Sequence, residues 1–245
     1  MKVKILLICS ILLLIVSLAV GLYPSISNYI NSKYCESTID NYSQKVDTLD
    51  TASKDEMIHE AEDYNDQLKN LDNDFSYSIY SNVIGYDDVL DFNDGVIGYI
   101  EIPKINVHLP IYHGSGEDIL SKGAAHLPNT AFPVGGIGNH CVLAAHTGYV
   151  GKVFFDNIDK LKTGDMIYIK ILDYTFAYKV FERHIVEPSD ISPCQVARDK
   201  DLLSLVTCHP YGQNTHRLIV TAERDESAET VNTATADSDT HKKIQ

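Results

Sequence analysis

The sequence predicts a mainly β domain, folded as a closed barrel or a sandwich, that follows an apolar N-terminal segment and a helical region. Three observations lead to this prediction. Short runs rich in β-branched and aromatic residues recur through residues 95–224, turn-rich pieces such as FPVGGIGN and KTGD separate them, and 245 residues suffice for one ordinary domain with appendages. The runs are VIGYIEI, VHLPIY, HCVLAAH, MIYIKI, FAYKVFERHIV, LLSLVTC and RLIVTAE.

The first element, residues 1–25, is predicted to be a membrane anchor. Residues 5–22, ILLICSILLLIVSLAVGL, are uncharged and match the about 17 to 25 residues that cross a bilayer. A cleaved signal peptide has a shorter apolar stretch of about 7 to 15 residues, although Ser17-Leu18-Ala19 offers a weak cleavage site. The leading Lys2 and Lys4 predict a cytoplasmic N-terminus, and therefore a single-pass protein whose later domain lies outside the cell.

The second region, residues 26–94, is predicted to contain two short helices and then a loop. Residues 26–70 are polar, and Ser53-Lys54-Asp55-Glu56 has the pattern of a capping box at a helix start. Residues 71–94 show no sustained period. Long loops in compact chains often close over functional sites, so this one is a possible lid.

Within and after the β-rich region the sequence predicts smaller features. Single helical turns are expected near residues 116–121 and 155–161. Residues 225–245 are polar, acidic and free of aromatic residues, which predicts a disordered tail.

Charge and cysteine spacing exclude two classes of function. A formal net charge of -14 argues against nucleic acid as a partner, because phosphate backbones bind clustered Lys and Arg. The cysteine spacings match no standard zinc pattern, so neither a metal nor any other cofactor is expected. Disulfides among the exported cysteines Cys35, Cys141 and Cys194 are left open.

The stretch LVTCHPYGQNTHR, residues 205–217, indicates thiol chemistry. An apolar strand ends at Cys208, and the turn-rich residues that follow predict a hairpin that places Arg217 across the ladder from the sulfur. A thiol needs a base or a cation beside it to become the reactive thiolate. Arginine stays protonated, so Arg217 would stabilise an oxyanion or orient a substrate carbonyl.

The base is then expected to be a histidine. His216 should point to the face opposite Arg217, and the side chain of His209 should diverge from its neighbour Cys208. His146 closes the run HCVLAAH before a glycine-containing turn, a common way to present a functional side chain at a sheet edge. On geometry His146 is the preferred base.

The same residues have plainer interpretations. A cysteine at the end of an apolar strand is often a small buried hydrophobe, and strand-end histidines and arginines are often only solvated. A non-catalytic, membrane-tethered scaffold with an inert Cys208 is therefore an alternative. A papain-like hydrolase predicts a cysteine that precedes its histidine, whereas the order here is His146, Cys208, Arg217.

At this point the sequence resembles a known family. Ser204 to Cys208 followed by Arg217 resembles the signature of sortases, the membrane-anchored cysteine transpeptidases of Gram-positive bacteria. Further segments follow one another as in the pilus-type, class C sortases: GYIEIPKINVHLPIYHG, GAAHLPNTAFPVGGIGNHCVLAAHTG and FFDNIDKLKTGDMIYI.

The resemblance implies the fold and the roles of the residues. It implies an eight-stranded sortase β-barrel with short helices, with Cys208 as nucleophile, His146 as general acid and base, and Arg217 as the oxyanion-stabilising cation. Thr207 is a candidate substrate contact. The implied reaction cleaves an LPxTG-like sorting signal between Thr and Gly and passes the acyl group to a lysine amine of a pilin. The alternative acceptor is an amine of a peptidoglycan precursor, as in wall-anchoring sortases.

Three departures separate this chain from class C members. No Asp-Pro dipeptide precedes the barrel, although many of these enzymes have one in a lid, so Asp74-Phe75 or Tyr86-Asp87 are the candidate lid residues here. Thr147 follows the histidine where class C usually has arginine. The tail is acidic, whereas many class C members end in a second membrane segment.

Overall fold

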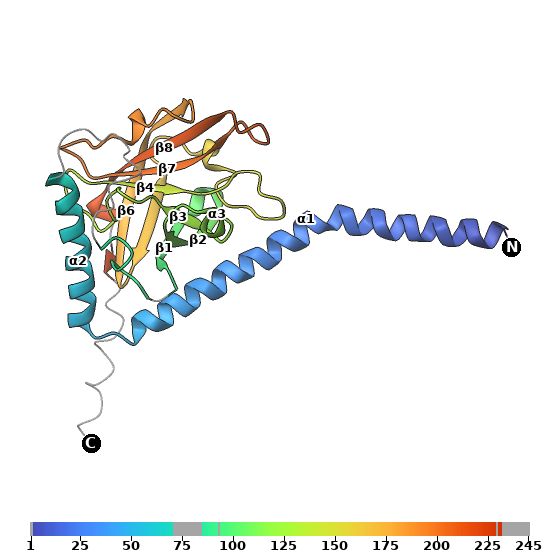
Figure 1. The fold of residues 1–245 in the computed structure, drawn as a ribbon, viewed down its shortest axis with the longest axis horizontal. Coiled ribbons are helices and arrows are strands. Elements are labelled where there is room, and N and C mark those ends of the chain that lie inside the picture. The colour runs from blue at the N-terminus through green and yellow to red at the C-terminus, as the bar shows by residue number, and fades with distance from the viewer. Residues whose placement is uncertain (1, 71–84, 93, 229, 232–245) are drawn as a thin grey trace, which may run out of the picture.

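A closed β-barrel forms the centre of this computed structural model, which describes residues 2–70, 85–92, 94–228 and 230–231 (Figure 1). Its strands are β1 (Val96–Ile102), β2 (Val107–His113), β3 (Ala124–His126), β4 (His140–Ala144), β5 (Met166–Ile171), β6 (Tyr174–Val186), β7 (Leu202–His209), β8 (His216–Arg224) and β9 (Thr230–Val231). Neighbouring strands follow the order β5-β1-β2-β3-β4-β7-β8-β6, and β5 also pairs with β6. This closure confirms the eight-stranded barrel, to which β9 adds at β6.

All seven apolar runs lie in strands, with one boundary shifted and one strand added. The run HCVLAAH ends as a strand at Ala144, so His146 lies in the loop that follows β4. β3 was not predicted as a strand, because three residues are too few to show an alternating pattern. β3 lies between β2, with which it pairs in parallel, and β4, with which it pairs antiparallel.

Alternation along β7 separates the barrel interior from an outer face. Leu203 and Leu205 are fully buried in the main core. Val206, on the opposite face, packs against a small outer cluster that contains Val142, Cys194 and Ile219. The connection between β6 and β7, which includes the single turn η3 (Ser192–Cys194), supplies Cys194 and so covers part of this outer face.

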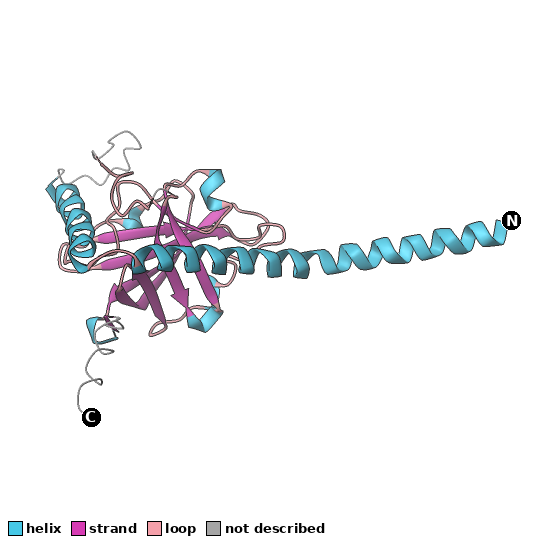
Figure 2. Cartoon of the chain, turned by 90° about the horizontal axis from the view of Figure 1, so that it is seen from below, coloured by secondary structure: helices cyan, strands magenta, loops and turns pink. Residues whose placement is uncertain are grey.

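Helix α1 (Lys2–Asp47) is much longer than expected, because the predicted anchor and the first predicted short helix form one continuous helix. Its C-terminal half places a stripe on the barrel at a spacing of three to four residues. The buried members of this stripe are Asn31, Cys35, Ile39, Tyr42 and Val46. Its N-terminal half projects away from the barrel (Figures 1 and 2), and the side chains there are exposed.

Helix α2 (Thr51–Asn70) starts earlier than the sequence pattern predicts. The side chain of Asp50, not that of Ser53, caps it: Asp50 Oδ1 accepts a hydrogen bond of 2.7 Å from the backbone N–H of Ser53. Ser53 itself lies inside the first turn. The prediction of a capping box at Ser53–Glu56 was therefore wrong by one helical turn.

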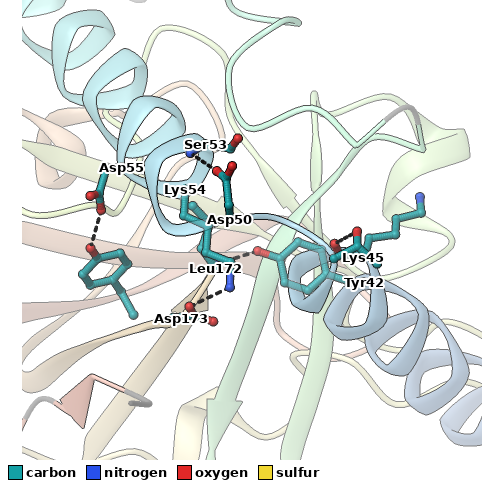
Figure 3. A network of polar contacts seen from close by, with 10 residues as sticks. Tyr42, Lys45, Asp50, Ser53, Lys54, Asp55, Leu172 and Asp173 are labelled. Atoms are coloured by element: carbon teal, nitrogen blue, oxygen red, sulfur yellow. Dashed lines mark hydrogen bonds and ion pairs between the residues drawn. The ribbon is translucent and has the colours of Figure 1, made fainter. Parts of the chain in front are cut away.

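A polar network fixes both helices to the turn between β5 and β6 (Figure 3). The Tyr42 hydroxyl of α1 accepts a hydrogen bond of 2.8 Å from the backbone N–H of Leu172. From α2, Lys54 Nζ lies 2.7 Å from Asp173 Oδ2, and Asp55 accepts a hydrogen bond of 3.2 Å from Tyr174. One turn of the barrel thus holds the end of α1 and the start of α2.

The remaining short helices are η1 (Pro103–Ile105), α3 (Glu117–Leu120), η2 (Ile158–Lys160) and η4 (Glu226–Ala228). α3 and η2 lie where single helical turns were predicted. Residues 226–228 and 230–231 differ from the predicted tail, because they form η4 and β9, and β9 pairs with Tyr174 and Thr175. Residues 232–245 lie outside the described part of the chain.

Candidate active site

Cys208 and Arg217 face each other across the β7–β8 hairpin. They are directly opposite in the antiparallel register. Residues directly opposite in such a pair project their side chains to the same face of the sheet. The predicted juxtaposition of thiol and guanidinium is therefore present in the backbone pairing.

That shared face is the outer face of the barrel. Along β7, Cys208 has the same parity as Val206, which packs against the outer cluster. On the neighbouring strand β6, Val186 pairs with Arg217 and packs against the same cluster. The thiol and the guanidinium thus lie on the outer face of the sheet, opposite to the face that packs on the main core.

His146 approaches this face from the loop that follows a third strand, β4. β4 runs parallel to β7, with Val142 opposite Ser204 and Ala144 opposite Val206. Two residues further along each chain are His146 and Cys208. His146 shares its parity with Val142, a member of the outer cluster, so the register predicts that the imidazole and the sulfur lie on one face at the same height.

Contacts beyond the end of β4 keep the two chains together. The backbone N–H of Ala145 donates a hydrogen bond of 3.2 Å to Val206 O. Thr207 donates from its hydroxyl to Ala145 O at 2.6 Å, and the Thr207 and Thr147 hydroxyl oxygens are 2.6 Å apart. Thr207 is only 4% exposed and has the parity opposite to Cys208, so its side chain holds the His146 loop in place.

Accessibility distinguishes Cys208 from the other cysteines of the barrel and its flanking helices. Its side chain is half-buried, whereas Cys35, Cys141 and Cys194 are buried. Desolvation by burial raises the pKa of Cys35 and of Cys194 to about 11, and that of Cys141 well above its ordinary value. All five cysteines, including the exposed Cys9, are free thiols.

Two residues that the sequence did not indicate surround His146. Glu117 of α3 places Oε1 3.3 Å from His146 Nε2, and the Tyr149 ring lies 5.0 Å from the imidazole ring. The Glu117 side chain is 73% exposed, while that of His146 is 23% exposed. Nothing in the spacing of Glu117 and His146 along the chain signals this contact, since α3 reaches the site only through the fold.

The Arg217 guanidinium is held by backbone groups. Its Nη1 donates to His216 O at 3.0 Å and to Asn214 O at 3.3 Å. Within the described ranges no carboxylate forms an ion pair with it. The charge is thus fixed by the hairpin turn and available to an approaching oxygen atom.

The other histidines near the site have different surroundings. His209 and His216 pair with each other one position beyond Cys208 and Arg217, so they lie on the opposite face, and His216 Nε2 lies 3.5 Å from Glu187. His140 bonds Gln195 O through Nδ1 and the Ser204 hydroxyl through Nε2. Both its ring nitrogens are occupied, and burial lowers its pKa.

The candidate lid residues are only partly described. Asp74 and Phe75 lie outside the described residues. Tyr86 is packed among aromatic rings on the α2 side of the barrel, stacked on His126 and on Phe132. Its hydroxyl bonds His126 and accepts from Gly114 N–H, and Asp87 beside it is exposed.

A cavity of about 530 Å³ extends along the same outer face. It lies over β6, β7 and β8, beneath the connection that leads into β7. Its lining includes Val186, Asp190, Ser192, Gln195, Leu202 and Thr221. It contains none of the three candidate residues, but Val186 is the strand partner of Arg217, so the cavity begins beside the site.

A comparison with protein-family models matches this chain to one family. The Sortase domain model aligns with residues 100–225, just over half of the chain. Sortase D of Bacillus subtilis is 32% identical over 130 residues, which make up 52% of this chain and 63% of that protein. Sortase A of Streptococcus agalactiae is 31% identical over a segment that makes up 55% of each chain.

Solved structures match over a larger share of the chain. Sortase C1 of Streptococcus agalactiae has a TM-score of 0.72 at 36% identity and covers 77% of this chain and 97% of its own. Clostridium perfringens sortase C, solved with the C-terminal cell wall sorting motif, has a TM-score of 0.69 at 42% identity, covering 78% and 98%. Streptococcus pneumoniae sortase C, whose crystal structure is described as giving insight into pilin substrate specificity, has a TM-score of 0.70 at 35% identity. The match covers 77% of this chain and 96% of that one.

Proposed function

The chain belongs to the sortase family and is most like its class C members, and from this premise we propose that it is a cysteine transpeptidase with Cys208, His146 and Arg217 as its catalytic residues. The observation that supports the assignment is their placement. Cys208 on β7 and Arg217 on β8 are direct partners, the loop after β4 carries His146, the β4–β7 register predicts the imidazole on the same outer face, and the thiol is partly accessible.

The first half of the reaction forms a thioester. The Cys208 thiolate attacks the carbonyl carbon of the scissile peptide bond, and the negative charge moves to the carbonyl oxygen. Arg217 stabilises that oxyanion with a charge that the hairpin has already oriented. His146 protonates the departing amine as the C–N bond breaks, which leaves the acyl group on the sulfur.

The second half transfers the acyl group to an amine. The incoming amine attacks the thioester carbonyl, His146 removes the proton that the nitrogen loses, and Cys208 leaves as thiolate. The product is a new amide bond, and the enzyme returns to its starting state. Attack by water instead would hydrolyse the thioester.

The proposed donor substrate is an LPxTG-like sorting signal, cleaved between Thr and Gly. Support comes from the similarity to Clostridium perfringens sortase C, which was solved with a sorting motif. The proposed acceptor is a pilin lysine, supported by the similarity to Streptococcus pneumoniae sortase C and its pilin specificity. The similarity to sortase A proteins supports a second candidate, the amine of a peptidoglycan precursor.

The proposed location is the cell membrane, with residues 1–25 as anchor and the barrel of residues 95–224 outside the cell. Among the described helices, α1 is long and apolar enough to cross a bilayer, and its apolar window is fully exposed. Lys2 and Lys4 would remain on the cytoplasmic side.

The test is to trap the acyl-enzyme. Incubation of the full chain with an LPxTG peptide should add the mass of the acyl fragment to Cys208, and a pilin lysine peptide or a wall-peptide amine should then release it as an amide. Cys208→Ala should form no adduct while keeping its fold. Cys194→Ala, which removes a buried thiol on the same outer face, is the matched control and should still form the adduct. Transfer by Cys208→Ala at the wild-type rate would overturn the assignment.

A further inference from the structure

The loop between His146 and Phe154, residues 147–153, lies against α1 just beyond its apolar run. Gly151 packs so closely on α1 that a Cβ atom there would collide with the Ser27 hydroxyl and lie 3.8 Å from the Tyr23 ring. The backbone N–H of Val153 donates a hydrogen bond of 3.1 Å to Asn28 Oδ1. These contacts fix the height of the loop along the helix.

The height corresponds to the headgroup layer of a bilayer that α1 crosses. Ser27 lies five residues beyond Leu22, which in a helix is about 7.5 Å along the axis. Each interfacial layer is about 5 to 7.5 Å thick, by the difference between total and hydrocarbon thickness. A loop whose Gly151 packs on Ser27 therefore sits at the depth of the lipid headgroups.

The side chains at this height suit that environment. Val150, at the loop tip, is 75% exposed, and Val153 is 44% exposed. Beside them on α1, Tyr23 and Ile26 are each more than half exposed. Tyrosine is enriched at membrane–water interfaces, where its ring is buried and its hydroxyl stays hydrated.

We infer that residues 147–153 and residues 23–27 of α1 form one lipid-contacting surface, which holds the His146 end of the barrel against the outer headgroup layer. The inference rests on the proposed membrane anchoring. The same loop contacts the proposed catalytic machinery, because Tyr149 packs on His146 and Lys152 Nζ lies 5.4 Å from the Tyr149 ring. Cys208, at the same end of the barrel as His146, thus lies near the bilayer, and Ile137, which precedes β4, lies at the opposite end.

The chain contains no tryptophan, so single reporters can be introduced one at a time. Three full-length variants, Leu14→Trp, Val150→Trp and Ile137→Trp, are reconstituted in phosphatidylcholine–phosphatidylglycerol vesicles. One vesicle set contains lipids with a nitroxide on the headgroup, and another contains lipids brominated in mid-chain. Ile137 is 65% exposed, so it controls for the preference of any exposed tryptophan for an interface.

Val150→Trp should lose fluorescence in proportion to the headgroup nitroxide, and Ile137→Trp should not. Leu14→Trp should be quenched by the mid-chain bromines. If the bromines quench Leu14→Trp but the headgroup nitroxide does not quench Val150→Trp, the lipid-contacting surface is overturned and the membrane anchoring is not. A second copy of the chain that covers the loop would give this same result. Equal nitroxide quenching of Val150→Trp and Ile137→Trp would overturn it too. Absence of bromine quenching in Leu14→Trp would overturn the membrane anchoring, and the surface with it.

Discussion

At the scale of single residues, the position of each thiol decides what it can do. Cys141 and Cys208 lie on adjacent strands, yet one points into the main core and the other to the outer face. Burial withholds the thiolate form from Cys141. Cys208 is half-buried and has a cation across the ladder. Parity along a strand thus separates a structural cysteine from a candidate nucleophile.

Alkylation of the full chain at neutral pH is expected to modify Cys208 before the buried cysteines. With their pKa raised to about 11, Cys35 and Cys194 have about one thiol in 10⁴ ionised at pH 7. Peptide mapping by mass spectrometry after a short exposure to iodoacetamide gives the order of reaction. In guanidinium chloride the preference should disappear. Modification of Cys141 ahead of Cys208 in the folded protein would contradict the outward placement of Cys208.

Glu117 provides a second prediction at this scale. Glu117→Ala should lower kcat for transfer by up to about fivefold, because the Glu117 carboxylate stabilises His146 whenever the imidazole carries its second proton, and an exposed ion pair contributes about 0.2–1 kcal/mol. The loss should shrink at high salt, which screens exposed charges. Steady-state kinetics at low and high ionic strength measures it. Asp118→Ala is the matched control, since His146 bonds Glu117 and not this neighbour, and equal losses in both variants would rule out a specific role.

At the scale of elements, local pattern predicted the long strands and missed what depends on tertiary contacts. The runs behind β1, β5 and β7 alternate or are continuously apolar, and each forms the expected strand. α1 was predicted as separate pieces because its uncharged apolar run ends at Leu22 and the residues from 26 onward are polar. The stripe from Asn31 to Val46 stabilises it only where the barrel provides a surface.

The network at the β5–β6 turn gives a prediction about how α1 is attached. Tyr42→Phe should destabilise the protein by about 1–3 kcal/mol, because a buried backbone N–H of Leu172 loses its acceptor. Urea unfolding of the detergent-solubilised chain, followed by near-ultraviolet circular dichroism, measures the change. Tyr99→Phe removes a hydroxyl from a ring that packs on Tyr42 and serves as control. Equal destabilisation by both variants would show that the hydrogen bond contributes nothing specific.

At the scale of the whole molecule, the barrel and the three candidate residues were within reach of the sequence, while their neighbours were not. Cys208 and Arg217 are joined by a hairpin, whose register follows from a short connection. His146 is 62 residues from Cys208; its place at a strand end before a glycine-containing turn pointed to it, the resemblance to sortases agreed, and the parallel β4–β7 register, continued by two residues, predicts the same pairing. Glu117 and Tyr149 approach His146 from α3 and from a loop, which no local pattern encodes.

Buried histidines make the stability of the whole fold depend on pH. Desolvation lowers the pKa of His113 and His140, and that of His126 to about 3. The unfolded chain takes up these protons near pH 6.5, and the folded chain resists them. Stability is therefore complete above about pH 6.5 and falls as the pH drops below it, by up to about 1.4 kcal/mol per pH unit for each histidine, and for His126 the fall continues to about pH 3.

Thermal unfolding should show that Tm decreases as the pH is lowered from about 7 to about 5. His126→Gln should reduce this dependence of Tm on pH. His59→Gln, which replaces a histidine with a 73% exposed side chain, is the control and should leave the slope unchanged. A slope that is the same in His126→Gln as in the wild type would contradict the role of His126.

Because α1 is one continuous helix, it determines the orientation of the barrel relative to the apolar N-terminal segment. Its apolar run and its barrel-bound stripe belong to one helix, so one inserted residue between them would rotate the barrel by about 100° around that helix. A flexible tether would absorb such a change. In the proposed membrane arrangement, the orientation of the Cys208 thiol relative to the membrane is fixed. Each molecule would then meet its partners by lateral diffusion in the bilayer and not by rotation about a flexible linker.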